Sequence, residues 1–220
     1  MHVDRLAGVA QVSDFPERLD RVGSYLETLH VRSSRQVRVQ GRVLEITLTS
    51  GASIDWRAVR ETLGLPRDSP NAGLGADIQA IQTALAAQGD VRVVGAPDVT
   101  AMNNEPAIMR AGTPGVALLT LTVIPQISAD GLVQLSVSPS WEERRDPSRK
   151  GESTSRVAEA DTVARVLDGS TVVLSGFLRS RDVMKKATGL SALFNTQQKE
   201  TAQAELIVLL RPTIVSPGAF

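Results

Sequence analysis

Few residues in this chain combine the type and the spacing that catalysis needs. The two histidines, His2 and His30, lie at the N-terminus and at the end of a predicted helix, and neither has the partner spacing of a metal site or a catalytic triad. The chain contains no cysteine, which excludes thiolate nucleophiles, thiolate zinc sites and disulfides. The sequence therefore predicts neither a metal site nor a nucleophilic catalytic site.

The charged run 142–146 contains adjacent glutamates that could supply the two carboxylates of a general acid–base reaction. No apolar segment flanks the run, so nothing would shift the pKa of either carboxyl, and we interpret it as a solvated loop or a hairpin tip. The glycine-rich segments 73–75 and 112–115 lack the Gly-Lys-Ser/Thr of a phosphate-binding loop. Trp56 and Trp141 are typical of packing anchors. We predict that the protein is not an enzyme and binds no cofactor.

The charge balance and the hydrophobic pattern exclude further classes of protein. Lys+Arg and Asp+Glu both total 24, and basic residues do not alternate with aromatic ones, so no nucleic-acid partner is predicted. No run approaches the roughly 18 consecutive apolar residues of a membrane-spanning helix. Aromatics form only 3% of the chain, which argues against a broad lipid-exposed band. Residues Met1–Arg5 begin no signal peptide, which suggests a mature fragment or removed upstream domains.

The elements that must position any functional residue alternate in the first part of the chain and are almost all strands in the second. A phase slip near Leu44 in an otherwise alternating strand suggests a bulge. Asp-Gly pairs between apolar runs predict hairpins. We predict strands over 6–12, 36–49, 91–94, 107–110, 116–125, 132–138, 158–167, 171–178 and 205–215, helices over 13–30 and 77–88, and a loop over 64–75.

This order of elements predicts an α+β fold, in which a small mixed α/β module is followed by a β-rich domain. We predict an N-terminal module over 1–64, a linker and helix over 65–90 and a β domain over 91–220. So many strands in one subunit would leave long apolar edges, and a ring of identical subunits would pair them. A monomeric β-sandwich is the alternative.

Several segments resemble, in order, the motifs of the secretin family, the ring-forming channel subunits of bacterial secretion and pilus machines. Val91–Ala107 is similar to the opening of the secretin domain, and Glu205–Val215 to its closing strand. Thr120–Gly131 resembles the family's V-x-P-Q-I strand and Asp-Gly turn, and Asp168–Leu178 its D-G-x-T-V-V-L-x-G hairpin. The signature residues are Asn103, Asn104, Pro125, Gln126, Asp130, Gly131, Asp168, Gly169, Gly176 and Pro212.

These signature residues are expected to have structural roles. The asparagines would tolerate turn geometry, Gly131 and Gly169 would take positive φ, and Pro125 would lie at a strand end or kink. Upstream, 13–20 and 35–56 resemble the stretch that precedes the secretin domain in type IV pilus and type II secretion members.

The resemblance implies a homo-oligomeric ring of roughly a dozen or more subunits, whose sheets join into a double-walled β-barrel. The implied function is passive conduction of proteins or a pilus across the bacterial outer membrane, and the implied location is that membrane, facing the periplasm. The implied partners are further copies of the chain, a pilotin and inner-membrane components of a secretion or pilus system. The alternative is a soluble ring or scaffold with secretin geometry that does not insert in a membrane.

Three segments depart from the family pattern. Family members carry a long gate hairpin where this chain has a single tight turn, so we predict a truncated gate, with a naturally short gate as the alternative. The family's amphipathic lip helix is also shortened, and the charged run 142–152 occupies the place of its membrane-crossing strands. The residues concerned are Gly112, Thr113, Pro114 and Gly115 in the gate turn, and Leu190, Leu193 and Phe194 as candidate lip or membrane contacts.

Overall fold

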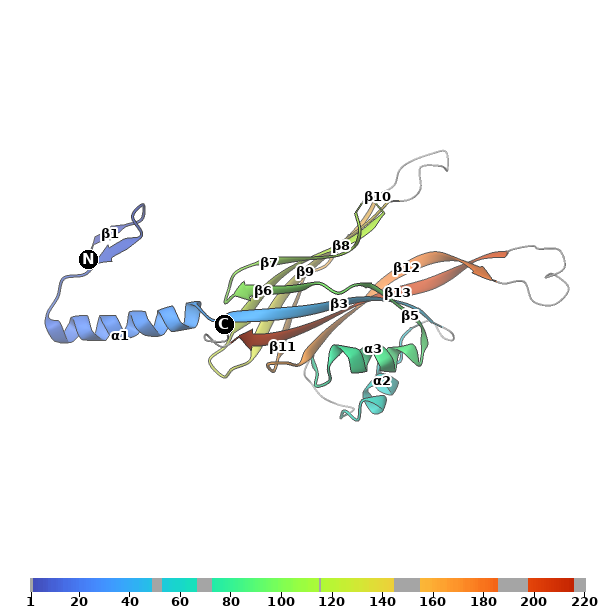
Figure 1. Cartoon of the computed structure of the whole chain (residues 1–220), viewed down its shortest axis with the longest axis horizontal. Helices are drawn as coiled ribbons and strands as arrows, with labels where there is room; N and C mark the ends of the chain where they lie inside the picture. Colours follow the sequence, from blue (N-terminus) through green and yellow to red (C-terminus); the bar gives the residue numbers. More distant parts are fainter. Residues whose placement is uncertain are drawn as a thin grey trace.

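Two antiparallel β-sheets, stacked face to face, form the body of the protein in the computed structural model (Figure 1). The structure describes residues 2–48, 53–66, 73–114, 116–144, 155–185 and 198–215. Its mixture of helices with mainly antiparallel strands confirms the predicted α+β class.

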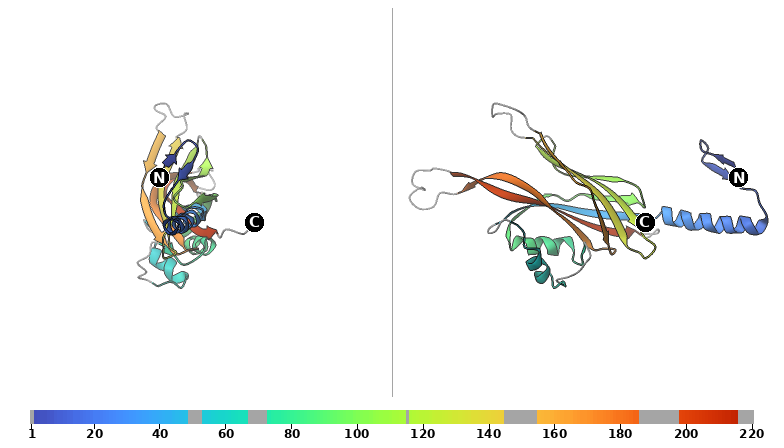
Figure 2. Two further views of the ribbon diagram at one scale, coloured as in Figure 1. Left: turned by 90° about the vertical axis from the view of Figure 1, so that its left-hand side faces the viewer. Right: turned by 180° about the vertical axis from the view of Figure 1, so that it is seen from behind.

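An N-terminal arm projects from this body (Figures 1 and 2). Strands β1 (His2–Asp4) and β2 (Val9–Gln11) form a hairpin. The strand predicted over 6–12 is therefore confirmed only over 9–11, because Gly8 turns the chain with a φ of 66°. Helix α1 (Pro16–Ser33) starts with proline in its first turn, where the missing N–H is tolerated, and it buries no side chain.

Sheet I is the longer of the two sheets and has the strand order β4-β12-β13-β3-β5. Strand β6 continues its edge by pairing with β3 beyond β5. Its strands are β3 (Gln36–Leu48), β4 (Gly73–Leu74), β5 (Gly89–Gly95), β6 (Asp98–Met102), β12 (Thr171–Lys185) and β13 (Gln198–Val215).

Sheet II has the order β10-β9-β8-β7, and β11 also pairs with β9. Strands β7, β8 and β9 are each hydrogen-bonded to the next strand along the chain, as the predicted Asp-Gly hairpin between β8 and β9 requires. The strands are β7 (Ala107–Thr113), β8 (Ala117–Ile127), β9 (Val133–Arg144), β10 (Ser155–Glu159) and β11 (Thr162–Val166).

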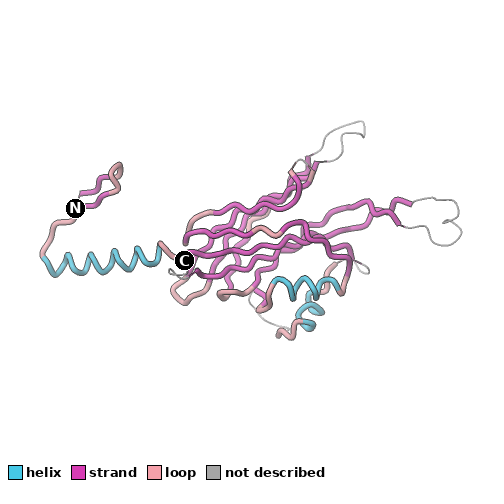
Figure 3. Tube along the Cα trace, in the orientation of Figure 1, coloured by secondary structure: helices cyan, strands magenta, loops and turns pink. Residues whose placement is uncertain are grey.

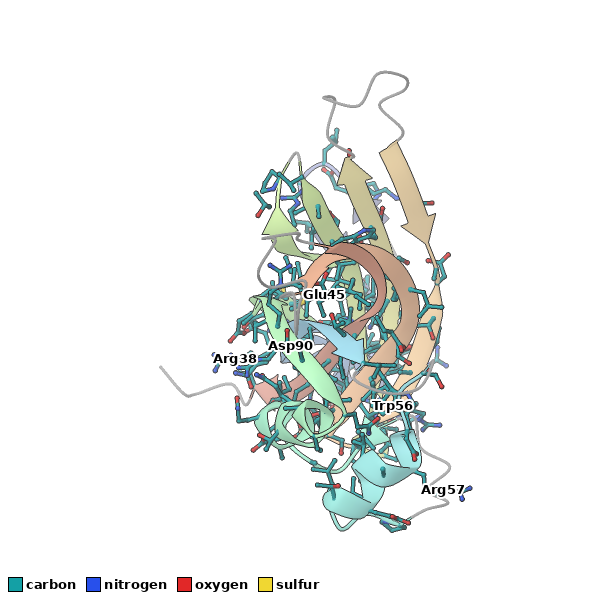
Figure 4. The ribbon with its side chains drawn as sticks, turned by 90° about the vertical axis from the view of Figure 1, so that its right-hand side faces the viewer. Arg38, Glu45, Trp56, Arg57 and Asp90 are labelled. Atoms are coloured by element: carbon teal, nitrogen blue, oxygen red, sulfur yellow. The ribbon has the colours of Figure 1, made fainter. Side chains whose placement is uncertain are left out.

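Two hydrophobic cores lie on opposite faces of sheet I. The first fills the space between the sheets, and the second lies under helices α2 (Trp56–Thr62) and α3 (Ile78–Ala86). Figure 4 shows α2, labelled at Trp56 and Arg57, on the side of sheet I away from sheet II. Helix α2 was not predicted from the sequence. The central strand β13 supplies both cores: Leu206, Val208 and Leu210 to the first, Ile207 and Leu209 to the second.

Strand β3 also supplies both cores, which accounts for its phase slip. Val43 packs between the sheets and Leu44 packs under the helices, while β3 keeps a continuous register with β13 along Gln36–Thr47. The slip marks the point where the buried face changes, and the pairing of β3 with β5 shifts register at the same point. The expected bulge is therefore confined to one side of the strand.

The pairing of β3 with β13 places parts of the predicted 1–64 module and the predicted 91–220 domain in one sheet. The boundaries at residues 64 and 90 stay predictions. Among the described residues, no helix has the length and apolar character needed to cross a membrane.

Candidate assembly surface

Free strand edges are the main surface feature of the body. Sheet II ends in β7 on one side and in β10 and β11 on the other. In sheet I, β12 pairs with β4 only at Thr171 and Val172, so over Val173–Lys185 its outer edge has no strand partner in the described part of the chain. Unpaired edge N–H and C=O groups are templates for pairing with another chain.

Among the described residues, the outer part of the β12–β13 ribbon has no neighbouring strand on either side. Strand β3 pairs with β13 only as far as Ala204, whereas β12 and β13 pair on to Lys185 and Gln198. Figure 3 shows this ribbon extending away from the body. A lone two-stranded ribbon is marginally stable in water, so further strands would stabilise it.

Both signature prolines lie where one neighbouring strand has ended. Strand β7 pairs with β8 only as far as Val123, and the Pro125 carbonyl accepts a 2.8 Å hydrogen bond from the Asn104 N–H. The Pro212 carbonyl likewise accepts a 2.9 Å bond from the Gly169 N–H. Each proline therefore lies beside a tight turn at the end of a neighbouring strand.

The two signature asparagines differ in role. Asn104 takes a φ of 66°, the left-handed region that asparagine tolerates. The Asn103 side chain instead joins three elements, because its Oδ1 accepts from the Ile127 N–H at 2.8 Å and its Nδ2 donates to the Arg32 carbonyl at 3.2 Å. The sequence predicted the turn but not this bridge between β8 and the end of α1.

We expect Asn103→Ala to lower the free energy of unfolding by about 1–3 kcal/mol, because the half-buried Ile127 N–H loses its acceptor. Asn104→Gly is the matched control, and its stability should stay close to that of the wild type because glycine adopts the same φ freely. Urea denaturation of both variants measures the difference. Equal losses would contradict the bridging role.

The turn residues of the two Asp-Gly hairpins take the expected conformation, with φ of 80° at Gly131 and 76° at Gly169. The Ser128 hydroxyl donates to Asp130, and together with the Arg165 guanidinium at 2.8 Å it holds the pKa of Asp130 below its ordinary value. The Asp168 carboxylate accepts from the Ile214 N–H at 2.8 Å, which ties this turn to β13.

A bulge at Gly176 redirects β12. The pairing of β12 with β13 shifts register between Leu174 and Phe177, Gly176 has a φ of 101°, and its N–H donates to a Glu205 carboxylate oxygen at 2.9 Å. On the outer face of sheet II, Gln126 accepts a 3.2 Å bond from Gln134 directly across the β8–β9 pair.

The predicted gate turn is a tight connection between β7 and β8. Thr113 pairs with Ala117, and the Val116 N–H donates to the Thr113 carbonyl at 3.1 Å, so Pro114 lies in the turn; Gly115 lies outside the described residues. Strand β9 extends into the charged run as far as Arg144. The lip candidates Leu190, Leu193 and Phe194 also lie outside the described residues.

The polar side chains around the start of α3 bind one another. Arg42 donates to Gln79 at 2.7 Å and to Gln82 at 2.8 Å, and Asp98 pairs with Arg38 at 2.6 Å. The hydrogen bond and charge of Arg38 lower the pKa of Asp98. In the described part of the chain, no group of three His, Cys, Asp or Glu residues could hold a metal ion.

A family model described as "Secretin: Bacterial type II and III secretion system protein" matches residues 113–216. This part of the chain is a secretin domain. It runs from the gate turn through β13 and includes four of the five strands of sheet II. Because secretin-family members are transport channels, the prediction that the protein is not an enzyme is confirmed.

Solved structures share the fold. The type II secretin GspD from enteropathogenic Escherichia coli is 17% identical, with a TM-score of 0.50 and coverage of 92% of this chain and 75% of that chain. ExeD from Aeromonas hydrophila is 15% identical, with a TM-score of 0.52 and coverage of 97% and 55%. At these identities the likeness shows the secretin fold alone.

A curated relative, "Uncharacterized protein y4xJ" of Sinorhizobium fredii (strain NBRC 101917 / NGR234), is 24% identical over a match that covers 71% of this chain. The chain spans 43% of the length of that relative.

Proposed function

We propose that this chain is the ring-forming subunit of a secretin-type channel that conducts proteins or a pilus across the bacterial outer membrane. The observation that carries the proposal is the set of free strand edges on a secretin domain. Secretin homologues lie in the bacterial outer membrane, which supports the location. The pilotin and inner-membrane partners are proposed from the family resemblance.

The strand directions favour closure into a ring. In sheet II, β7, β8, β9 and the β10–β11 edge alternate in direction, so β7 runs antiparallel to the β10–β11 edge. In sheet I, the free outer edge of β12 beyond Val172 and the strand β5 at the other side likewise run antiparallel to each other. Rotation about an axis along the strands preserves their directions, so each edge meets an antiparallel neighbour from the next copy.

We also propose that the short β7–β8 turn leaves the ring without a gate at this position. The turn closes within three residues, 114–116, and a gate hairpin needs strands of several residues on each side. A ring of such subunits would keep its passage open here.

A soluble ring or scaffold is the second candidate, and the charged run 142–152 favours it because charges on a lipid-facing strand cost about 2–4 kcal/mol each near the bilayer centre. Purified rings that stay monodisperse without detergent would support the scaffold, and rings that precipitate would support insertion.

Negative-stain electron microscopy of the purified full chain tests the ring itself. We expect particles with a central hole that are far larger than one 23.5 kDa chain. A stable population of single chains at high concentration would contradict the proposal.

A further inference from the structure

Opposite charges lie at the two ends of one cross-strand row in sheet II. Arg110 on the β7 edge pairs in register with Thr120 of β8, Thr120 with Ser140 of β9, and Ser140 with Glu159 of β10. Cross-strand partners project from the same face of a sheet. Arg110 and Glu159 therefore lie on the same face, at the same level, at opposite edges.

A second acidic residue extends the negative edge. Glu159 pairs with Ser140 and Thr162 pairs with Val137, so β10 and β11 keep one register along β9 across the break between them. Asp161 therefore lies two residues further along the same edge, on the face of Glu159. Arg110, Glu159 and Asp161 are all exposed.

None of these three charges has a partner in the part of the chain that the structure describes. Arg110, Glu159 and Asp161 form no ion pair or side-chain hydrogen bond within the described residues. The centre of the face between them carries uncharged side chains, namely Thr120, Thr122, Ile124, Ser136, Ser138 and Ser140. Glu142 lies two residues further along β9 on this face, whereas Arg110, Glu159 and Asp161 lie at the two edges that the ring proposal brings together.

We infer that Arg110 of one copy forms an ion pair with Glu159 of the next copy, and that this pair helps to set the register between subunits. The inference rests on the proposed function. Antiparallel continuation of sheet II places the β7 edge of one copy beside the β10–β11 edge of the next. With the strands along the ring axis, residues in one row then face each other, whereas a tilt of the strands shifts the two edges along each other. A shift of two residues exchanges Glu159 for Asp161 and keeps the attraction, whereas a shift of one turns the side chain to the other face.

The same charges select between kinds of assembly. A two-fold dimer formed through β7 alone would bring two Arg110 edges together, and one formed through β10 and β11 would bring two acidic edges together. Two Arg110 side chains that face each other, or two copies of Glu159 and Asp161 that do so, place like charges in contact, which is unfavourable. Arg165, on the same face of β11, is paired with Asp130 at 2.8 Å. The head-to-tail contact joins Arg110 to Glu159 and Asp161, and head-to-tail contacts are those that close rings.

Disulfide trapping tests the contact, because the chain contains no cysteine of its own. We expect the double variants R110C/E159C or R110C/D161C to give a ladder of covalent multimers on denaturing gels after oxidation. Within one copy the two positions lie three strands, about 14 Å, apart, so a disulfide within a single chain is excluded. The matched control is T83C/E159C, in which the exposed Thr83 of α3 replaces Arg110; it should give no ladder.

Charge reversal provides a second readout that does not depend on disulfide geometry. Arg110→Glu should raise the protein concentration needed for half-assembly about tenfold, and addition of Glu159→Arg and Asp161→Arg should restore it. If the wild type forms rings in the microscope but the cysteine variants give no ladder and the charge reversals give no rescue, this contact is wrong and the ring proposal is unaffected. Wild-type material that forms no rings would overturn the proposed function together with the contact.

Discussion

Replacement of Leu206 by alanine should lower the free energy of unfolding by about 2–5 kcal/mol. Leu206 lies in the central strand β13, is fully buried, and faces the core between the two sheets. Removing its side chain leaves a cavity that two hydrogen-bonded sheets close only in part, so the lost burial and the cavity both destabilise the fold. Urea denaturation followed by circular dichroism measures the change.

The control for Leu206 is Leu178 in the adjacent strand β12. The pairing places Leu206 opposite Phe177, and Leu178 follows directly, but 59% of its surface is exposed. Leu178→Ala should therefore change the free energy of unfolding by less than about 0.5 kcal/mol. Losses of similar size in the two variants would contradict the placement of the core on the Leu206 face.

The strands of the second half were predictable because their signals are local. Each Asp-Gly pair fixes a turn, as the positive φ of Gly131 and Gly169 shows, and the alternation on either side fixes which residues face the core. The predicted strand 116–125 corresponds to β8 and the predicted strand 205–215 to the inner part of β13. The outer part of β13 was missed, because its extent depends on pairing with β12 and not on an apolar pattern.

Elements that depend on tertiary packing were harder to predict. Strand β3 changes its buried face at Val43 and Leu44 because sheet II covers one end and the helices cover the other, and alternation alone cannot show this. Helix α2 spans only seven residues, too few for a clear period. A signal was present in Asp55, whose side chain caps the helix by accepting from the N–H groups of Arg57 and Ala58.

The edge contact was also hidden from the sequence. Arg110 and Glu159 are 49 positions apart, and their common level depends on the registers of the β7–β8, β8–β9 and β9–β10 pairs together. A slip of one residue in any pair would move one charge to the opposite face. The family motifs mark the turns that fix these registers, but they do not include either charged residue.

Replacement of Gly112 by valine should open the tight turn at the proposed site of the truncated gate. Gly112 has a φ of 108°, and a Cβ there would lie 2.3 Å from the Ala117 carbonyl oxygen, a backbone atom of the facing strand. The strain of this φ alone costs about 1–3 kcal/mol, and the contact forces the two strands apart as well. We expect a large loss of stability and a loss of rings, measured by urea denaturation and by electron microscopy.

Gly131→Val separates strain from contact. Gly131 has a similar φ of 80° in the β8–β9 turn, but a Cβ there would meet no atom within 4 Å. Gly131→Val should therefore show only the cost of the positive φ. The difference between the free energies of unfolding of the two variants then measures the cost of the added contact between β7 and β8. If Gly112→Val were no more destabilising than Gly131→Val, the two strands could separate at little cost, and the turn would not be the rigid closure on which an ungated passage depends.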